Sequence, residues 1–468
     1  MSGPAGTHDF DVAVIGGGSA GYAAARTTAS AGMRVAVIDG AEELGGLCIL
    51  RGCMPTKALL YAAEVRHLCR RAGTWGMQAG ESRFDFAQVM ARKDALIQEF
   101  ADYRRQQLQG GAFELIRAKA RLVGPHALAL STGRTLTARN FVITTGSTVA
   151  PSPLASLDEA GFITSDDALV LRKLPRSMIV LGGGPVALEL AQFFARFDVK
   201  VTLVQRSPHV LKGFDPDAAG ELEKALCREG LAIHTGTQLI GARRHGNGKT
   251  VSFRQGEETV EVTAEEILFA LGRVPNTSGL GLAEAGVKME GLRIVTNDHM
   301  QTSVPHIFAA GDCLGVHEIV HVAIQQGEIA GYNLAHPFAP RKMDYRLITN
   351  VVFTEPQVAQ VGLTEQEAGA KGLVCLSAKY PFNDHGKSII MDTKEGFVKL
   401  LANPATGEIW GGCCVGPLGG ELIHEIVAAM AKRMTVQELA AMPHYHPTLA
   451  EIWTYPAEEL AALIVHLA

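Results

Sequence analysis

A pattern of strand, glycine-rich turn, helix and strand occurs twice in this chain, and no other feature constrains the fold as strongly. The first copy, residues 11–39, reads DVAVIGGGSAGYAAARTTASAGMRVAVID. The second, residues 178–205, reads MIVLGGGPVALELAQFFARFDVKVTLVQ. A single glycine-rich turn can reflect tight packing alone, but two copies in this context are typical of doubly wound dinucleotide-binding units. The pattern predicts an α/β protein with two Rossmann-like domains.

The glycines of each turn have separate expected roles. In the first copy, Gly16 permits the tight turn, Gly18 lets the backbone approach a pyrophosphate, and Gly21 allows close packing of helix on strand. Asp39, at the end of the second strand, is placed to accept hydrogen bonds from a ribose hydroxyl. The corresponding turn positions of the second copy are Gly182, Gly184 and Ala187.

Three further apolar runs end in glycine, at residues 141–147, 267–277 and 306–313. Each is typical of a strand that leads into a loop where backbone or a carboxylate meets a ligand. Gly46, which lies shortly after the first copy of the pattern, is a further candidate ligand contact. The candidate contacts in the three loops are Thr145, Gly146, Gly272, Arg273, Gly311 and Asp312.

Size and composition describe a compact protein of several domains. The 468 residues predict roughly three domains. From about Tyr345 the pattern changes to strand-like alternation followed by helices, which predicts a separate C-terminal α+β domain without a nucleotide motif. The net charge of -5 and the scattered Lys and Arg residues disfavour nucleic acid and anionic membranes as partners.

The chain shows no targeting or membrane signal. The first ten residues, MSGPAGTHDF, lack a charged start and an apolar core, and no apolar run is long enough to cross a bilayer. We therefore expect a cytoplasmic protein. In a reducing compartment, a close cysteine pair indicates catalysis or metal binding rather than a structural disulfide. The close pairs are Cys48/Cys53 and Cys413/Cys414.

The segment GGLCILRGCMPTKALL, residues 45–60, carries the first pair. Zinc is a poor interpretation, because no matching second pair exists. The following residues read as a helix, so Cys53 should lie near a helix N-terminus, where the macrodipole favours a thiolate. The pair is interpreted as a redox dithiol, the alternative being two buried cysteines that happen to be close. Cys413 and Cys414 are adjacent on a predicted strand and are expected to be ordinary packing residues.

The segment HYHPTLAEIW, residues 444–453, can supply a proton acceptor. An imidazole can take the proton of an attacking thiol, and a carboxylate can orient that imidazole. His446 and Glu451 fit these roles, and His444 competes for the role of base.

Taken together, these motifs resemble the flavoprotein pyridine nucleotide-disulfide reductases, the family of dihydrolipoamide dehydrogenase, glutathione reductase and mercuric reductase. The similarity covers nearly the whole chain, and the Cys-x4-Cys-x-Pro-Thr-Lys and His-Pro-x3-Glu stretches are its specific parts. The resemblance implies an FAD-binding domain in two parts (1–150 and 271–345), an NAD(P)-binding domain (151–270) and a dimerisation domain (346–468).

The resemblance also implies roles for single residues. Cys53 would be the thiolate that faces the flavin, and Cys48 would exchange with the substrate. Lys57 and Glu189 match the family's ion pair near the flavin N5 edge, where positive charge favours reduced flavin. The homodimer would share its active site, each subunit delivering His446 and Glu451 to the thiols of the other.

This chain departs from the family pattern around the first cysteine. Leu47 and Leu50 stand where the family commonly has Thr and Asn, and Arg51 adds a positive charge. Asp39 replaces the more usual Glu. Leu47, Leu50 and Arg51 are expected to alter the flavin contacts and the potential of the dithiol, whereas the shorter Asp39 should still serve a ribose contact.

The nucleotide preference is read from the end of the second strand of the second copy. NAD binding is usually signalled by an acid there, whereas a 2'-phosphate needs cations. This chain has Gln205, then Arg206 and later Lys212, and Ala187 stands at the third glycine position. NADPH is therefore favoured over NADH, the alternative being that both cations are solvated surface charges.

The substrate is left open between a lipoyl-type and another small-molecule disulfide. The HPTLAE form is nearest to lipoamide dehydrogenases, whereas the nucleotide residues lean towards NADPH-dependent reductases. Mercuric ion is disfavoured because the chain ends in AALIVHLA, without a cysteine pair. Soluble transhydrogenases resemble this chain but lack an intact dithiol. Two other functions stay open: a docked subunit of a multienzyme complex, and an NAD(P)H oxidase or quinone reductase.

Overall fold

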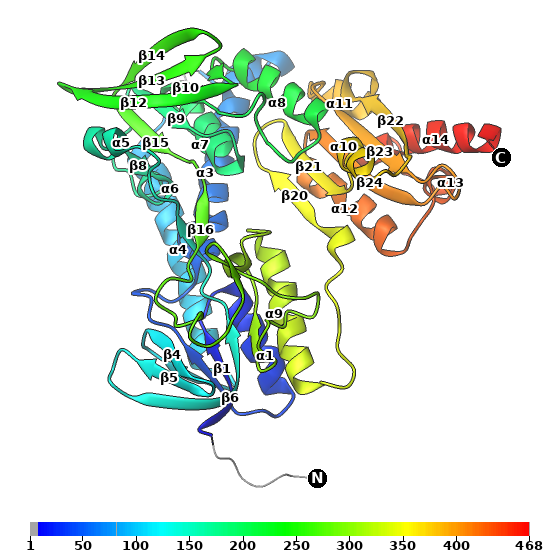
Figure 1. Ribbon diagram of the computed structural model, residues 1–468. Helices are drawn as coiled ribbons and strands as arrows, with labels where there is room; N and C mark the ends of the chain where they lie inside the picture. The colour runs from blue at the N-terminus through cyan, green and yellow to red at the C-terminus, as the bar shows by residue number, and fades with distance from the viewer. Residues whose placement is uncertain (1–7, 81, 468) are drawn as a thin grey trace. The chain divides into compact units, whose positions relative to one another are not determined.

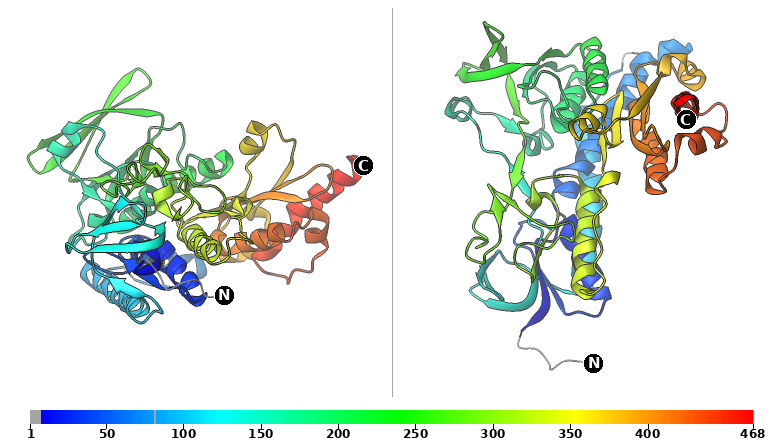
Figure 2. Two further views of the ribbon diagram at one scale, coloured as in Figure 1. Left: turned by 60° about the horizontal axis from the view of Figure 1, so that its bottom comes forward. Right: turned by 45° about the vertical axis from the view of Figure 1, so that its right-hand side comes forward.

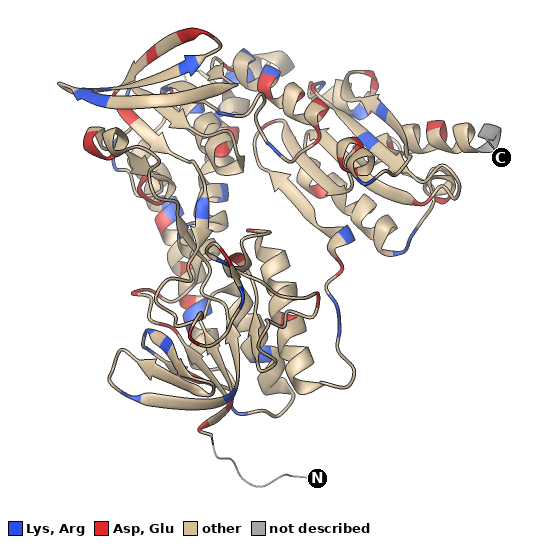
Figure 3. Ribbon diagram, in the orientation of Figure 1, with Lys and Arg blue, Asp and Glu red and all other residues tan. Residues whose placement is uncertain are grey.

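The computed structural model describes residues 8–80 and 82–467 and divides into two compact units (Figure 1). Unit 1 comprises residues 1–58, 90–151 and 272–343, and unit 2 comprises residues 59–89, 152–271 and 344–468. Residues 1–7 of the opening segment MSGPAGTHDF, for which no targeting signal was predicted, lie outside the described residues, as does Ala468. Acidic and basic positions are interspersed along the described parts of both units (Figure 3).

Unit 1 is built on the first copy of the repeated pattern. Its sheet has the order β3-β2-β1-β6-β5-β4, and β19 pairs with β6. The pairs of β1 with β2 and β6, and of β19 with β6, are parallel. Helices α1 and α9 pack side by side in this unit (Figure 2). The strands are β1 (Phe10–Ile15), β2 (Val35–Ile38), β3 (Glu114–Ile116), β4 (Ala120–Gly124), β5 (Ala127–Leu130), β6 (Thr135–Ile143) and β19 (Ile307–Ala309), and the helices are α1 (Ser19–Ser30) and α9 (Val320–Ala335).

Two short strand pairs complete unit 1. Two long helices, α3 (Cys53–Arg71) and α4 (Phe86–Gln109), each contain residues of both units. The pairs are β7 (Ser147–Val149) with β16 (Arg273–Pro275) and β17 (Met289–Glu290) with β18 (Arg293–Ile294). The remaining helical elements are α2 (Leu47–Leu50) and the 3-10 turn η2 (Asp312–Leu314).

Unit 2 repeats the Rossmann-like arrangement with the order β11-β10-β9-β15-β8, all parallel. Strands β9 and β10 are almost wholly buried, as expected for parallel strands covered on both faces. A three-stranded antiparallel sheet, β12-β13-β14, adjoins it. The elements of residues 59–271 in this unit are η1 (Ala72–Trp75), α5 (Ala155–Ala160), β8 (Ile163–Thr164), α6 (Ser165–Ala168), β9 (Ser177–Leu181), α7 (Pro185–Arg196), β10 (Lys200–Val204), α8 (Pro216–Arg228), β11 (Ala232–His234), β12 (Thr237–His245), β13 (Gly248–Gln255), β14 (Glu258–Ala264) and β15 (Glu266–Phe269).

The C-terminal part of unit 2 is the predicted α+β segment. Its antiparallel sheet has the order β20-β21-β24-β23-β22, and α12 packs against β21 and β24. A core around Phe382, Ile423 and Trp453 joins sheet and helices. The elements are η3 (Tyr345–Leu347), β20 (Thr349–Val352), β21 (Gln357–Gly362), α10 (Glu365–Ala370), β22 (Leu376–Pro381), η4 (Phe382–Asp384), α11 (Gly386–Met391), β23 (Phe397–Ala402), β24 (Ile409–Gly416), α12 (Gly419–Ala431), α13 (Val436–Ala441), η5 (Ala450–Trp453) and α14 (Thr454–Leu467).

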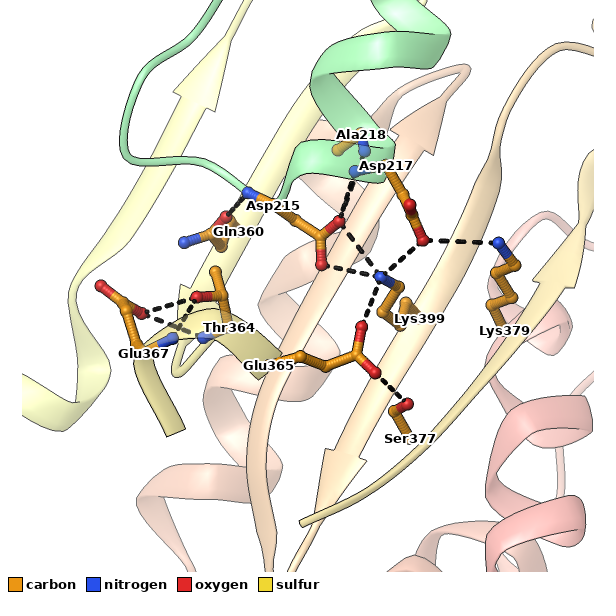
Figure 4. A network of polar contacts seen from close by, with 10 residues as sticks. All are labelled: Asp215, Asp217, Ala218, Gln360, Thr364, Glu365, Glu367, Ser377, Lys379 and Lys399. Carbon is orange, nitrogen blue, oxygen red and sulfur yellow. Dashed lines mark hydrogen bonds and ion pairs between the residues drawn. The ribbon is translucent and has the colours of Figure 1, made fainter. Parts of the chain in front are cut away.

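A buried lysine ties these two parts of unit 2 together (Figure 4). Lys399 of β23 donates to Asp215 at 2.8 Å, to Asp217 at 2.9 Å and to Glu365 at 2.9 Å. Asp215 caps the N-terminus of α8, and its backbone N–H donates to the Gln360 side chain at 2.9 Å. Because Lys399 and Asp215 are almost fully buried, each charge depends on the other for compensation.

We predict that Lys399→Met lowers the free energy of unfolding by about 3–5 kcal/mol, because it leaves a buried carboxylate without its cation. Lys379→Met is the matched control. Lys379 lies 3.4 Å from Asp217, but its side chain is 58% exposed, so the expected loss is below about 1 kcal/mol. Urea denaturation of both variants measures the difference, and equal losses would contradict this account.

Candidate active site

The two glycine turns share one packing constraint. A Cβ on Gly16 would lie 2.5 Å from the Thr144 carbonyl oxygen, and one on Gly182 would lie 2.3 Å from that of Ala270. Both glycines have φ near +110°, a conformation that disfavours any side chain. Each turn is therefore pressed against the end of a neighbouring strand.

The third position of the turn differs between the two copies. A Cβ on Gly21 would collide with the Gly16 carbonyl oxygen, at 1.8 Å. In the second copy the corresponding residue is Ala187, which is buried in α7. The second helix therefore accommodates a methyl group where the first requires glycine.

The middle glycines leave their backbone open. The nearest atom to a Cβ on Gly18 is the Gly46 Cα at 3.9 Å, and within the described residues nothing lies within 4 Å of one on Gly184. Both residues precede a helix, α1 and α7 respectively, whose N-terminus favours anions. Gly46 approaches the first turn so closely that a Cβ on it would lie 2.8 Å from Gly18 Cα. The cysteine segment is thereby packed against the first glycine turn.

The residue at the end of the second strand faces the turn in both copies. Asp39 accepts a hydrogen bond from the Gly17 backbone N–H at 2.8 Å and another from that of Ala41 at 2.8 Å. In the second copy, a Cβ on Gly183 would lie 2.9 Å from the Gln205 Cγ. The first site thus has a carboxylate beside its turn, and the second has a neutral amide.

The predicted loop residues of unit 1 meet around β7 and β16. Asp312 accepts a hydrogen bond from the Ser147 hydroxyl at 2.8 Å, and the Arg273 side chain donates to the same hydroxyl oxygen at 2.8 Å. The Gly272 carbonyl accepts from Ala150 N–H at 3.1 Å. Among the described residues, the buried Thr145 hydroxyl has no hydrogen-bond partner. The neighbouring glycines of these loops are Gly146 and Gly311.

These observations test whether unit 1 suits a dinucleotide cofactor such as FAD. The open backbone of Gly18, the acceptor Asp39 and the unpartnered Thr145 hydroxyl offer the polar contacts that such a ligand needs. The residues present therefore fit the cofactor expected from the sequence.

The cysteine pair lies where one short helix ends and a long one begins. Cys48 is in α2, and Cys53 is the first residue of α3, as predicted. Both thiols are partly buried. The pKa of Cys48 is raised, first by its hydrogen bond with Cys53 and second by burial, whereas the charge of Lys57 lowers it. The pair is thus chemically unequal, with Cys48 favoured as the protonated thiol.

Arg104 of α4 interacts electrostatically with Cys48, and the sequence motifs did not indicate it. It stacks on the Tyr22 ring at 4.4 Å, and among the described residues its buried Nε has no hydrogen-bond partner. Burial lowers the pKa of Arg104, and interactions with Tyr22 and Cys48 raise it. A partly buried guanidinium whose Nε has no hydrogen-bond partner among the described residues is suited to bind an anionic group.

The predicted base segment forms the expected dyad. His446 Nδ1 lies 3.0 Å from Glu451 Oε2. The His446 side chain is 79% exposed and Glu451 is buried, so the Nε2 side of the ring is accessible. His444 has both ring nitrogens engaged, with the Met442 carbonyl at 3.0 Å and Glu425 at 2.6 Å. The geometry therefore favours His446 over His444 as the base.

The structure also locates the residues of the predicted ion pair near the flavin and the predicted cations for a 2'-phosphate. Lys57 lies in the second turn of α3, in unit 1. Glu189 is buried in α7 of unit 2 and accepts from the Phe353 backbone N–H at 3.0 Å. Their predicted ion pair stays a prediction. Arg206 and Lys212 are exposed, and their side chains form no hydrogen bond or ion pair within the described chain.

The second cysteine pair is structural. Cys413 and Cys414 are both buried in β24, and Cys414 belongs to the core of the C-terminal segment. No cluster of His, Cys, Asp and Glu suited to a metal ion is found in residues 8–80 and 82–467. Over the same ranges, no helix has both the length and the apolar character needed to cross a bilayer.

Comparison with known families assigns the chain. The model of the family described as pyridine nucleotide-disulphide oxidoreductase matches residues 10–327, and that of the family's dimerisation domain matches residues 348–457. The chain is a pyridine nucleotide-disulphide oxidoreductase. The family, fold class and enzyme class expected from the sequence are confirmed, and the family is FAD-dependent.

Several relatives of this oxidoreductase are similar over nearly their full length. A dihydrolipoyl dehydrogenase of Thermus scotoductus is 36% identical, with 98% of this chain and 99% of the relative covered. A mercuric reductase of Staphylococcus aureus is 31% identical, with 95% and 81% covered. The crystal structure of LpdA from Mycobacterium tuberculosis superposes with a TM-score of 0.86 at 29% identity, covering 96% of this chain and 99% of that one.

The open second turn leads to a prediction about nucleotide binding. Gly184→Ala should fold normally, because Gly184 has φ -83° and a methyl group meets no described atom within 4 Å. It should raise KM for the nicotinamide nucleotide about tenfold, or about 1.4 kcal/mol, because the methyl occupies the approach to the turn. Gly182→Ala should instead lower stability by about 2 kcal/mol or more, because it forces a strained φ and a backbone clash. Thermal unfolding and steady-state kinetics separate the two effects; a destabilised Gly184→Ala protein would contradict the expectation.

Proposed function

We propose that the enzyme is a dihydrolipoamide dehydrogenase-like oxidoreductase in which Cys48 and Cys53 form the redox-active dithiol. The observation that carries this proposal is the placement of two unequal thiols, one in α2 and one at the start of α3, packed through Gly46 against the first glycine turn. The dihydrolipoyl dehydrogenases among its relatives support the substrate class.

The exchange of thiols and disulfide follows from these residues. In the oxidised enzyme, a substrate thiolate attacks Cys48 of the Cys48–Cys53 disulfide, and Cys53 leaves as a thiolate. The second substrate thiol then gives its proton to His446 and attacks the substrate sulfur of the mixed disulfide, so that the bond to Cys48 breaks and Cys48 leaves as a thiolate, to which His446 can return that proton. The substrate leaves as a disulfide, and the enzyme keeps the two electrons as a dithiol. Bound FAD supplies the electron transfer between this dithiol and the nicotinamide nucleotide.

The dyad and the dimerisation domain belong to the same proposal. The matched dimerisation domain supports a homodimer. In the proposed dimer, His446 and Glu451 serve the thiols of the other subunit, so the active site is shared between two chains. Lys57 and Glu189 are proposed to pair near the flavin, with Lys57 close enough to Cys48 to influence its ionisation.

NADPH is the proposed nucleotide. Arg206 and Lys212 are exposed and form no side-chain hydrogen bond or ion pair with the described residues, which suits them to a 2'-phosphate, and Gln205 places no negative charge beside the turn. Dihydrolipoyl dehydrogenases typically use NAD, so this preference would set the enzyme apart from the relatives that it resembles.

A second candidate function is reduction of an acidic low-molecular-weight disulfide by NADPH. Arg104 favours it, because its partly buried guanidinium interacts electrostatically with Cys48 and has an Nε without a hydrogen-bond partner among the described residues, so a substrate carboxylate could bind there. Comparison of kcat/KM for neutral lipoamide and for glutathione disulfide, each in the direction that the enzyme catalyses, decides between the two candidates.

We predict that Cys48→Ser abolishes turnover with lipoamide and glutathione disulfide but retains bound flavin, because the exchanging sulfur is lost and the dinucleotide contacts are not. Absorbance spectra and steady-state assays check both halves. An NAD(P)H oxidase or quinone reductase would work without the dithiol. Full activity in Cys48→Ser would therefore refute the proposed function.

We also predict that Arg206→Ala lowers kcat/KM for NADPH by about 10- to 100-fold and changes that for NADH by less than about threefold, because a hydrogen-bonded charge pair contributes about 1.5–3 kcal/mol. Arg254→Ala is the control, since Arg254 is an exposed arginine of β13. An unchanged NADPH preference in Arg206→Ala would overturn the assignment.

A further inference from the structure

The carboxylate of Glu451 lies between two imidazoles. One oxygen, Oε2, is 3.0 Å from His446 Nδ1. The other, Oε1, is 3.4 Å from Nε2 of His385. Neither the family motifs nor the spacing of the base segment indicated His385. It lies 66 positions before Glu451 in the sequence and directly precedes α11.

His385 is held in place on its other side. Its ring is fully buried, and its Nδ1 lies 2.8 Å from the Ser388 hydroxyl. The rings of Phe382 and Tyr455 meet it edge-on, with centroids 6.3 Å and 6.4 Å away. The ring therefore has little freedom to turn away from Glu451.

The hydrogen-bond network assigns the tautomer of His385. Burial lowers its pKa, and Glu451 and a hydrogen bond with the Thr448 backbone act in the opposite direction, so the neutral ring carries one N–H. If that proton were on Nδ1, the lone pair of Nε2 would face a carboxylate oxygen. With the Ser388 hydroxyl as donor to Nδ1, the N–H is on Nε2, which lies 3.4 Å from Glu451 Oε1. Among the described residues this buried nitrogen forms no well-aligned hydrogen bond, and Glu451 supplies the acidic oxygen within 4 Å of it.

Few other charges reach this ring. In the described part of the chain, Glu451 is the one acid within 4 Å of a ring nitrogen of His385, and the charge of His446 also acts on the ring. Asp384, the preceding residue, is engaged by the Tyr380 hydroxyl at 3.0 Å. Tyr380 stacks on Tyr455, whose ring contacts His385.

We propose that His385 is a positioning residue, which holds the second oxygen of Glu451 so that His446 presents Nε2 to the reacting thiols. This inference rests on the proposed function. A carboxylate held at one oxygen can rotate, whereas one held at both has a fixed plane, and the ring bonded to it inherits that orientation. His385 stays neutral while His446 takes and returns the proton.

The test compares His385→Phe, which removes the donor but keeps a ring, with His385→Gln, which can keep an N–H near the position of Nε2. The dithiol–disulfide exchange half-reaction of the His385→Phe holoenzyme should slow by about 10-fold or more, and that of His385→Gln should stay within about threefold of wild type. Flavin reduction by NADPH, followed by anaerobic stopped flow, should change in neither variant. The pH profile of kcat/KM for the disulfide substrate should shift in His385→Phe and return in His385→Gln.

Two further variants separate the possible failures. His424→Phe is the control for a His-to-Phe change in the same segment, because His424 is exposed and bonds the Gly420 carbonyl. His446→Gln tests the proposed function itself: if exchange is unaffected by it, the dyad assignment fails. If His446→Gln slows exchange but His385→Phe does not, the inference about His385 alone is overturned.

Ser388→Ala covers the case in which His385→Phe does not fold. Removal of the hydroxyl frees the His385 tautomer, so exchange should slow while flavin reduction does not. Unchanged exchange in Ser388→Ala would then refute the proposal.

Discussion

The absence of a side chain at Gly16 and Gly182 is the constraint on which the two nucleotide sites depend. Both turns pack so closely against the next strand that a methyl group has no space, and this contact brings each helix N-terminus to the end of its sheet. The middle glycines, which face open space, can then offer their backbone to a ligand. Tight packing and ligand access thus occur two residues apart in the same turn.

The proposed redox centre follows from the first of these turns. Gly46 packs on Gly18, so Cys48 begins its short helix next to the turn that the dinucleotide requires. The hydrogen bond with Cys53 and burial raise the pKa of Cys48, so Cys48 is favoured as a protonated thiol before any substrate binds. On the C-terminal segment, His446 and Glu451 form a dyad whose imidazole is exposed and whose carboxylate is buried. The buried partner can hold a fixed geometry, and the exposed one can reach a substrate.

The sequence predicted what depends on local patterns and left open what depends on distant contacts. Both Rossmann-like units, the C-terminal α+β segment and the start of a helix at Cys53 follow from apolar periodicity and glycine spacing. The short helix α2 carried no such signal, because four apolar residues after a glycine pair suit several structures. The choice of His446 over His444 depends on Glu425, which is 19 residues from His444. Arg104 and His385 are distant in the sequence from Cys48 and Glu451, with which they interact in the folded chain. No local sequence pattern could therefore indicate them.

The salt-bridge cluster around Lys399 bears on how proteins of this type can be recombined. Two of its acids come from the nucleotide-binding part of unit 2, whereas the lysine and the third acid come from the C-terminal segment. A chimera that took its nucleotide-binding part from a homologue without acids at positions 215 and 217 would leave the buried Lys399 with Glu365 alone among its three acidic partners. Exchange of cofactor preference between such enzymes is therefore easier by substitution around the turn than by transfer of the whole segment.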